Sequence, residues 1–204
     1  MATRSKPDHY AKRARREGYG ARSVYKLEEI QRRFGVLKRG DRVLDIGAAP
    51  GSWSQLAARI AGENGMIVAV DLAPMDALEQ IGVITTVTGD VFSPEILGVL
   101  ESYGPFDAII SDAAPRTTGN RSVDTARSAA LVERAISLCY SLLVPRGNLV
   151  AKVFQGGEEQ RLLTELKTRF GSARMVKPQA SRSESFETFL VAIGFTGHSN
   201  RSDD

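Results

Sequence analysis

From residue 42 onward, short and nearly continuous apolar runs alternate with segments whose apolar residues recur at helical spacing. A strand that is apolar at almost every position is buried on both faces, as in a parallel sheet covered by helices on both sides. A chain of 204 residues is long enough for one domain with a single large core. We therefore predict a single α/β domain with a mostly parallel sheet.

The same pattern sets the bounds of the individual elements. We predict strands over residues 42–46, 66–71, 83–88, 108–111, 148–154, 173–177 and 188–195. We predict helices over residues 23–34, 52–61, 123–143 and 158–170. The domain then spans residues 21–195, between a basic N-terminal arm (1–20) and a flexible C-terminal tail (196–204).

Positive charge is concentrated at the N-terminal end. Residues 1–42 hold 13 Lys and Arg against 5 Asp and Glu, whereas residues 43–204 hold 14 against 19. A basic arm on an acidic body indicates a polyanionic partner, although charge alone fits a solvated tail about equally well. Tyr10, Tyr19 and Tyr25 favour nucleic acid, because an aromatic ring can stack on a base.

Composition excludes several other classes of protein. The single cysteine, Cys139, cannot form an intrachain disulfide or a thiolate cluster, and the two histidines lie near the ends of the chain. No apolar run approaches the ~20 residues needed to span a bilayer, and the charged first residues contain no signal-peptide core. We expect a cytoplasmic protein without a bound metal.

The turn after the first predicted strand reads GAAPG over residues 47–51. Glycines let a backbone approach a ligand closely, although many strand–helix turns contain them for backbone reasons alone. Asp71 closes the second strand 20 residues after Gly51, which is where doubly wound folds bind a ribose diol. Asp90 closes the third strand, where an acid can accept from an adenine amino group.

This turn differs from the dinucleotide fingerprint G-x-G-x-x-G, and the acidic Asp45 beside it suits a cationic ligand better than a diphosphate. S-adenosylmethionine combines a sulfonium, an amino group, a ribose and an adenine. Matching groups at three strand ends therefore favour this methyl donor as the cofactor. Trp53 is either a helix residue packed on the sheet or a wall of the donor pocket, and we favour the wall.

Lys152 lies inside the apolar strand 149–154, where a buried lysine needs a reason. Lys26, Asp112 and Glu187 would each, alone, fit a surface, capping or edge role. Taken together, two lysines and two acids at the edges of one sheet suit the removal of a proton from a weakly acidic hydroxyl.

Six segments carry a resemblance to a known family: GARSVYKL (20–27), GAAPGSWS (47–54), DLAPMD (71–76), SDAAP (111–115), KVFQG (152–156) and SRSESFE (181–187). They resemble, in the family's order, the FtsJ/RrmJ ribose 2'-O-methyltransferases of large-subunit (23S) ribosomal RNA, of the methyltransferase E type. The resemblance covers about residues 10–195. The chain departs from it at Ser52, where Gly is common, and at Arg116, where bacterial members usually have Asn.

The resemblance implies a Rossmann-like methyltransferase sheet with an antiparallel last strand, S-adenosylmethionine as donor, and a uridine ribose in the A-loop of 23S RNA as acceptor. Carried over residue by residue, the donor would contact Gly51, Trp53, Asp71, Asp90 and Asp112. The catalytic tetrad would be Lys26, Asp112, Lys152 and Glu187, with Lys152 as proton acceptor.

Other functions stay open at this point. The chain could methylate another RNA, such as transfer RNA or an mRNA cap, or bind RNA without catalysis on the same fold. Lys152 could also stabilise the developing alkoxide by its charge instead of acting as a base. We expect a monomer whose partner is ribosomal RNA, either naked or within the assembled large subunit.

Overall fold

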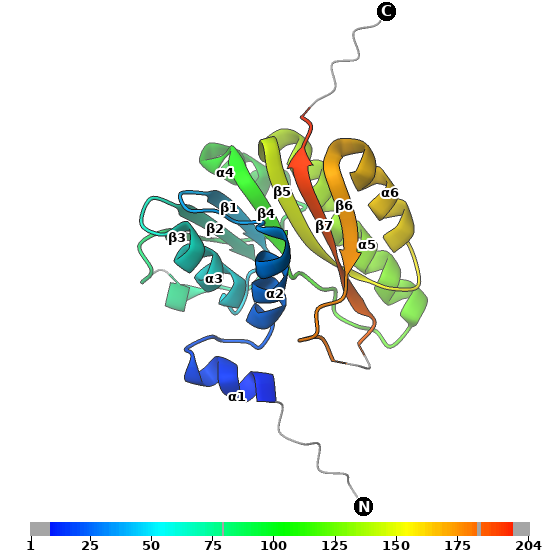
Figure 1. Ribbon diagram of the computed structural model, residues 1–204, viewed down its shortest axis with the longest axis horizontal. Helices are drawn as coiled ribbons and strands as arrows, with labels where there is room; N and C mark the ends of the chain where they lie inside the picture. The colour runs from blue at the N-terminus through cyan, green and yellow to red at the C-terminus, as the bar shows by residue number, and fades with distance from the viewer. Residues whose placement is uncertain (1–8, 79, 183–184, 198–204) are drawn as a thin grey trace, which may run out of the picture.

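The computed structural model describes residues 9–78, 80–182 and 185–197 (Figure 1). The strands are β1 (Arg42–Ile46), β2 (Met66–Asp71), β3 (Ile84–Thr88), β4 (Phe106–Ser111), β5 (Leu143–Phe154), β6 (Phe170–Val176) and β7 (Glu187–Phe195). The helices are α1 (His9–Arg16), α2 (Val24–Phe34), α3 (Ser52–Ala61), α4 (Pro94–Tyr103), α5 (Arg121–Leu142) and α6 (Glu159–Arg169), with a 3₁₀ turn η1 (Asp76–Leu78). None of the described helices is long and apolar enough to cross a membrane.

All seven strands form one sheet in the order β3-β2-β1-β4-β5-β7-β6. The pairs among β1 to β5 are parallel, whereas β7 inserts antiparallel between β5 and β6. The predicted α/β domain, with a mostly parallel sheet and an antiparallel last strand, is confirmed. Because β1, β2, β3 and β4 run the same way, their carboxyl ends meet at one edge, where the glycine turn, Asp71 and Asp90 lie.

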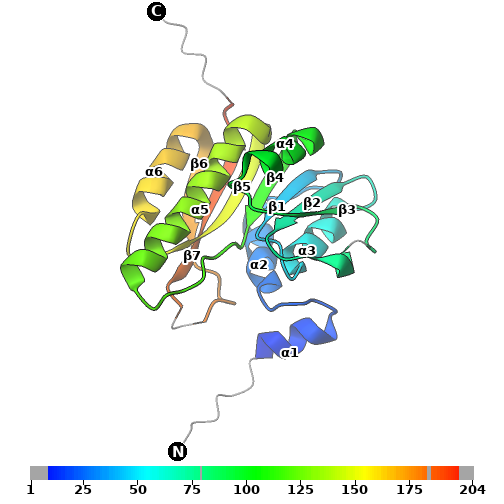
Figure 2. The ribbon, with the colours of Figure 1, turned by 180° about the vertical axis from the view of Figure 1, so that it is seen from behind.

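Helices cover both faces of the sheet, and the alternation of side chains along each strand assigns them to two cores. Val43, Ile67 and Val150 pack with α2 and α3, which lie in front in Figure 1. Their neighbours Leu44 and Val68 pack with α5 and α6 on the face seen in Figure 2. This double burial explains why the strands read as continuous apolar runs.

Two helices were not predicted. Helix α4 begins at Pro94, and the Ser93 side chain accepts a hydrogen bond from the Ile96 backbone. A capping serine followed by proline is a helix-start signal that could have been used. Helix α1 buries only Ala14, so it has almost no apolar periodicity to detect. Strand β5 also begins at Leu143, earlier than the predicted residue 148.

Residues 9–20 of the basic arm contact the domain. Ala14 and Tyr19 are buried in the core that α2 and α3 share. Arg13 donates to Glu17, which also accepts from the Tyr25 hydroxyl at 2.9 Å. The Arg13 guanidinium lies 4.3 Å from the centre of the Tyr25 ring. Helix α1 is therefore tied to α2, whereas residues 1–8, and residues 198–204 of the predicted tail, lie outside the described part.

The turn after β1 depends on Gly47, whose φ is +71°. A Cβ atom there would lie 2.5 Å from the Cβ of Ala113, in the loop that follows β4. The absence of a side chain thus allows the loops after the neighbouring strands β1 and β4 to pass in contact. Both loops line the cavity described below.

We predict that Gly47→Ala lowers the free energy of unfolding by about 2–4 kcal/mol, because the left-handed backbone conformation and the clash with Ala113 both cost energy. The matched control is Gly40→Ala. Gly40 has a φ of +84°, and a Cβ added there would meet nothing within 4 Å, so only the conformational cost of about 1 kcal/mol remains. Urea unfolding of both variants measures the difference. Equal losses would contradict the close approach of the two loops.

Candidate active site

The structure brings Lys26, Asp112, Lys152 and Glu187 together as two ion pairs. Lys26, from the first turn of α2, pairs with Glu187 at the start of β7. Lys152, from β5, lies with its Nζ 3.0 Å from Oδ1 of Asp112, just after β4. All four side chains are at most 16% exposed. Buried charges need partners at this range, and each of these has one.

Glu187 interacts with both lysines. Burial acts to raise the pKa of Glu187, but the hydrogen bond and charge of Lys26 and the charge of Lys152 outweigh it, so its pKa lies below the ordinary value of 4.5. Glu187 is therefore ionised at neutral pH. It links the two ion pairs electrostatically, although its direct contact is with Lys26.

Lys152 is held at two points. Its Nζ donates to the backbone carbonyl of Asp112 at 2.6 Å, in addition to the carboxylate contact. In the antiparallel pairing of β5 and β7, Lys152 stands opposite Phe189, and Phe154 stands opposite Glu187. Opposed residues project from the same face of a sheet, so β5 and β7 present Lys152 and Glu187 side by side.

Two stacked aromatic rings, Phe189 and Trp53, lie next to Lys26. The Lys26 ammonium lies 5.8 Å from the centre of the Phe189 ring, and that ring stacks on Trp53 at 5.7 Å. The Trp53 indole donates to the backbone carbonyl of Ser23, the residue before α2. Sequence reasoning missed Phe189 and Ser23. Phe189 follows Glu187 by two residues in a predicted strand, so both project from one face. This spacing is a sequence signal that could have identified Phe189.

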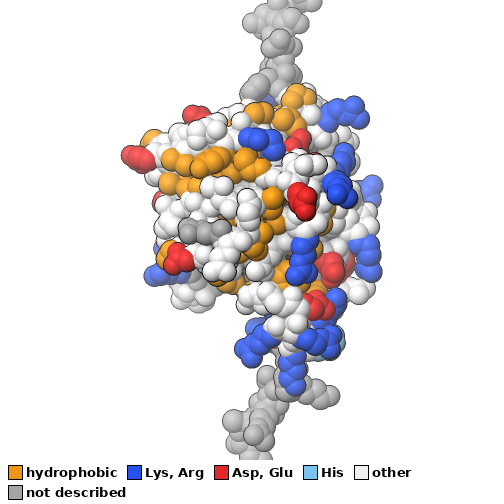
Figure 3. Space-filling model, turned by 90° about the vertical axis from the view of Figure 1, so that its left-hand side faces the viewer, with side chains coloured by type: hydrophobic (Ala, Val, Ile, Leu, Met, Phe, Trp, Pro, Cys, Tyr) orange, Lys and Arg blue, Asp and Glu red, His pale blue; other side chains and the backbone are white. Residues whose placement is uncertain are grey.

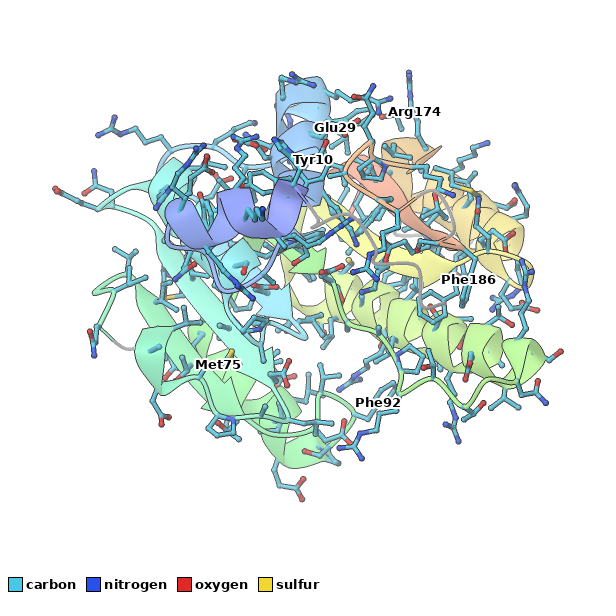
Figure 4. The ribbon with its side chains drawn as sticks, turned by 90° about the horizontal axis from the view of Figure 1, so that it is seen from below. Tyr10, Glu29, Met75, Phe92, Arg174 and Phe186 are labelled. Atoms are coloured by element: carbon cyan, nitrogen blue, oxygen red, sulfur yellow. The ribbon has the colours of Figure 1, made fainter. Side chains whose placement is uncertain are left out.

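A cavity of about 930 Å³ opens next to the tetrad, at the carboxyl ends of β1 to β4. Asp71, Asp90 and Asp112 all line it, together with Gly47 and the loop after β4. Asp112 thus belongs both to the tetrad and to the cavity wall. Phe92, which is 49% exposed and labelled in Figure 4, also lines the cavity.

The carboxylates at these strand ends give the cavity negative charge and also hold the loops around it by hydrogen bonds. Asp71 accepts from the backbone amides of Ala49 and Ala73, which fixes its carboxylate between two loops. Asp90 accepts from the amide of Phe92. Each carboxylate oxygen keeps a further lone pair that can accept a ligand hydroxyl or amine.

Asp45 lies behind this wall and is fully buried. Its Oδ2 accepts from the Ser54 hydroxyl at 2.6 Å, whereas Oδ1 has no hydrogen-bond partner among the residues that the structure describes. Burial raises the pKa of Asp45 to about 7, the Asp112 and Asp71 charges act in the same direction, and the Ser54 hydrogen bond opposes them. The strand ends therefore form an acidic region that favours a cationic ligand.

Two of the predicted donor contacts do not line the cavity. Trp53 is 2% exposed and packs on Phe189, so its side chain supports the tetrad. Gly51 has a φ of +99°, and a Cβ there would lie 2.5 Å from the Leu78 side chain. Packing against η1 is sufficient to require glycine at that position. Arg116 and Arg127, which were not predicted as donor contacts, do line the cavity.

The groups present fit S-adenosylmethionine. Asp71 and Asp90 can accept from ribose hydroxyls and an adenine amino group, and the acidic wall suits a sulfonium and an ammonium. The backbone at Gly47, which packs closely against Ala113, forms part of the wall of this cavity. Among the described residues there is no group of three or more His, Cys, Asp or Glu that could hold a metal ion.

We predict that Glu187→Gln lowers the free energy of unfolding at pH 7 by about 3–5 kcal/mol, because it leaves the buried Lys26 charge without a charged partner. A lowered carboxyl pKa stabilises the fold above the unfolded-state value and loses that effect as pH falls through the folded-state value. The gap between wild type and variant should therefore close below about pH 4.5. Denaturant unfolding across pH measures it.

The matched control for this variant is Glu133→Gln, which breaks the ion pair between Glu133 and Arg161, whose side chains are about half exposed. Exposed pairs contribute about 0–1 kcal/mol, so this substitution should have little effect at any pH. A Glu187→Gln protein as stable as wild type at pH 7 would contradict the role of the buried pair.

Residues 19–195 match the family described as FtsJ-like methyltransferase. The chain is 46% identical over 193 residues to the ribosomal RNA large subunit methyltransferase E of Treponema denticola, covering 95% of this chain and 97% of the relative. It is 47% identical over 187 residues to the protein of the same name from Syntrophobacter fumaroxidans, covering 91% and 94%.

Solved structures agree with the fold. A Plasmodium falciparum protein described as a ribosomal RNA methyltransferase superposes with a TM-score of 0.76 at 27% identity, covering 88% of this chain and 100% of that one. Aeropyrum pernix fibrillarin, solved with bound S-adenosyl-L-methionine, superposes at 0.60 with 17% identity, covering 84% and 76%. The chain therefore belongs to the FtsJ-like methyltransferase family and is an S-adenosylmethionine-dependent methyltransferase.

Proposed function

We propose that this protein transfers a methyl group from S-adenosylmethionine to the 2'-oxygen of a uridine ribose in large-subunit (23S) ribosomal RNA, in the A-loop. The observation that carries the proposal is the position of Asp112, which lines the cavity and pairs with Lys152. A methyl group held in the cavity would therefore face a hydroxyl held at the tetrad. The names of the relatives support ribosomal RNA as the substrate.

The tetrad suits the handling of one proton. S-adenosylmethionine supplies a methyl group already activated by a sulfonium, so the protein must align the acceptor and remove its proton. We assign Lys152 Nζ, in its neutral amine form, as the proton acceptor for the ribose hydroxyl, because only an amine with a free lone pair can take the proton. Lys26 is assigned as the cation that orients the oxygen. As the O–C bond forms, the C–S electron pair passes to sulfur, and the proton remains on Lys152.

The roles of the acids follow from their contacts. Asp112 holds Lys152 against the cavity wall through both its carboxylate and its carbonyl oxygen. Glu187 holds Lys26 and also bears on Lys152. All four residues come from one polypeptide, so the tetrad is complete within a monomer. Asp71 and Asp90 would bind the ribose and adenine of the donor, with Gly51 and Trp53 shaping the turn and helix behind them.

Mapping of ribose methylation tests both substrate and mechanism. We expect 23S RNA from a strain lacking this protein to lose one 2'-O-methyluridine, and the wild-type gene to restore it. Lys152→Ala should not restore it. Lys152→Arg is more informative, because arginine keeps the charge but cannot act as a base in a protein. If Lys152 is the base, single-turnover methylation by the Arg variant should fall roughly 10²–10⁴-fold.

Calorimetry with S-adenosylmethionine provides the control for those variants. Lys152→Arg should bind the donor normally, whereas Asp71→Ala should bind it weakly. Near-normal turnover by Lys152→Arg would assign Lys152 to charge stabilisation instead. A methyl group that is lost from transfer RNA, or a complete ribosomal RNA pattern in the deletion strain, would refute the proposed substrate.

The basic arm is proposed to hold RNA beside this site. Figure 3 shows Lys and Arg side chains gathered at the lower end of the molecule, where α1 lies. Lys12, Arg15 and Arg16 of α1 are exposed, whereas Arg13 is engaged with Glu17 and Tyr25. The first three are therefore available to phosphates, and the fourth mainly attaches the helix.

We predict that replacing Lys12, Arg15 and Arg16 with Ala flattens the dependence of log Kd for RNA on log salt by roughly two to three units, at about 0.7–0.9 per phosphate contact. The control removes the same charge from other parts of the surface, by replacing the exposed Lys38, Arg39 and Lys167. That variant should keep the wild-type slope. Identical slopes for both triple variants would show that α1 makes no specific phosphate contacts.

A further inference from the structure

One aromatic side chain next to the tetrad has no role in the chemistry above. Phe186 directly precedes Glu187, and its carbonyl accepts from the amide of Gln155 at 2.7 Å, just beyond the end of β5. Its ring meets Phe154 edge-on, with 4.6 Å between centres. The Arg121 guanidinium lies 5.6 Å from the ring centre and donates to the Gln155 carbonyl. The ring is thus fixed from two sides.

The geometry of β5 places the Phe186 ring near the tetrad, with Phe154 between Phe186 and Lys152. Lys152 and Phe154 are two residues apart on β5 and project from the same face, about 7 Å apart. Phe154 faces Glu187, and Phe186 packs on Phe154. The aromatic rings of Phe154 and Phe186 therefore lie next to Lys152, the proposed proton acceptor, at the carboxyl end of β5.

The Phe186 ring is partly exposed. Phe186, just before β7, is only half-buried, whereas Phe189 within β7 is fully buried. Figure 4 shows Phe186 beside α5 on the face where the strands end, well apart from Phe92 at the donor cavity. An aromatic side chain that is held in place and partly open, next to a site for a nucleotide, suits stacking with a base.

We propose that Phe186 is the surface on which the base of the acceptor nucleotide stacks, with Arg121 and Phe154 holding its ring. This inference rests on the proposed function, because it assumes that a ribose hydroxyl lies at Lys152. One nucleotide then spans the step along β5, with its ribose at the tetrad and its base on Phe186. Stacking of an unpaired base would turn the 2'-oxygen toward the cavity and fix its direction of attack.

The test is a double-mutant cycle in which one change removes the Phe186 ring and the other removes the base of the target nucleotide. The RNA is the substrate identified by the mapping experiment, prepared as a fragment with either the normal target nucleotide or an abasic ribose in its place. The protein variants are Phe186→Leu, which keeps an apolar side chain against Phe154, and Phe186→Tyr, which keeps the ring. Single-turnover methylation gives the rate and the RNA concentration dependence for each combination.

The matched control is Phe34→Leu. Phe34 is also a partly buried ring with an arginine beside it, since Arg33 lies 5.2 Å from its centre, but it ends α2 far from Lys26. The rise of a helix puts these two residues about 12 Å apart. Donor affinity by calorimetry and thermal unfolding are measured for every variant, so that loss of fold is detected separately.

On the normal RNA we expect Phe186→Leu to lower the second-order rate constant of single-turnover methylation roughly 5- to 100-fold, the range for one base–aromatic stack, while Phe186→Tyr and Phe34→Leu stay near wild type. On the abasic RNA, wild type and Phe186→Leu should be equally slow, because the stack is already absent. Donor affinity should be unchanged throughout.

Two results would overturn the inference. Phe186→Leu could match wild type on the normal RNA, or both proteins could lose the same factor on the abasic RNA, which would mean that side chain and base act independently. Failure of the proposed function has a different signature, because wild type would then methylate no ribosomal RNA fragment or subunit at that ribose.

Discussion

Two ammonium groups are buried beside the central strands, and the fold must supply two carboxylates to match them. Leaving one buried charge without its partner costs about 3–5 kcal/mol, a large part of the roughly 5–15 kcal/mol that stabilises an ordinary domain. The contacts that satisfy them join distant segments, since Lys26 ties α2 to β7 and Lys152 ties β5 to the end of β4. The proposed chemistry of the site and the stability of this part of the sheet thus rest on the same four side chains.

Electrostatics also shape the cavity for the methyl donor, which lies at strand ends rich in acidic residues. Burial raises the pKa of Asp45 to about 7, and repulsion from the nearby charges of Asp112 and Asp71 adds to that rise. A cationic donor relieves part of that repulsion when it binds. Asp112 lies where this acidic wall meets Lys152, so in the proposed reaction the positive methyl group and the acceptor oxygen would lie on two sides of one carboxylate.

Much of this architecture could be predicted from the sequence, because burial on both faces leaves continuous apolar strands. The bounds of β1, α3 and β2 agree with the structure. Helix α1 could not be found in this way, since Ala14 is its only buried residue and most of its other side chains are charged. The tetrad was named through family resemblance; of its members, only Lys152 stands out by local pattern. The Trp53 side chain is buried because it stacks on the ring of Phe189, which is distant in the sequence. A contact of this kind cannot be read from the residues around Trp53.

The place of β7 in the sheet bears on how the protein forms during synthesis. This strand follows β1 to β6 in the chain, yet it occupies an inner position between β5 and β6. Until it emerges from the ribosome, β5 presents an unpaired edge and Lys26 lacks Glu187, so earlier segments can collapse but cannot close the sheet. A chain that stops before residue 187 would keep that edge open to other chains. Completion of the candidate active site and protection from aggregation therefore occur in the same late step.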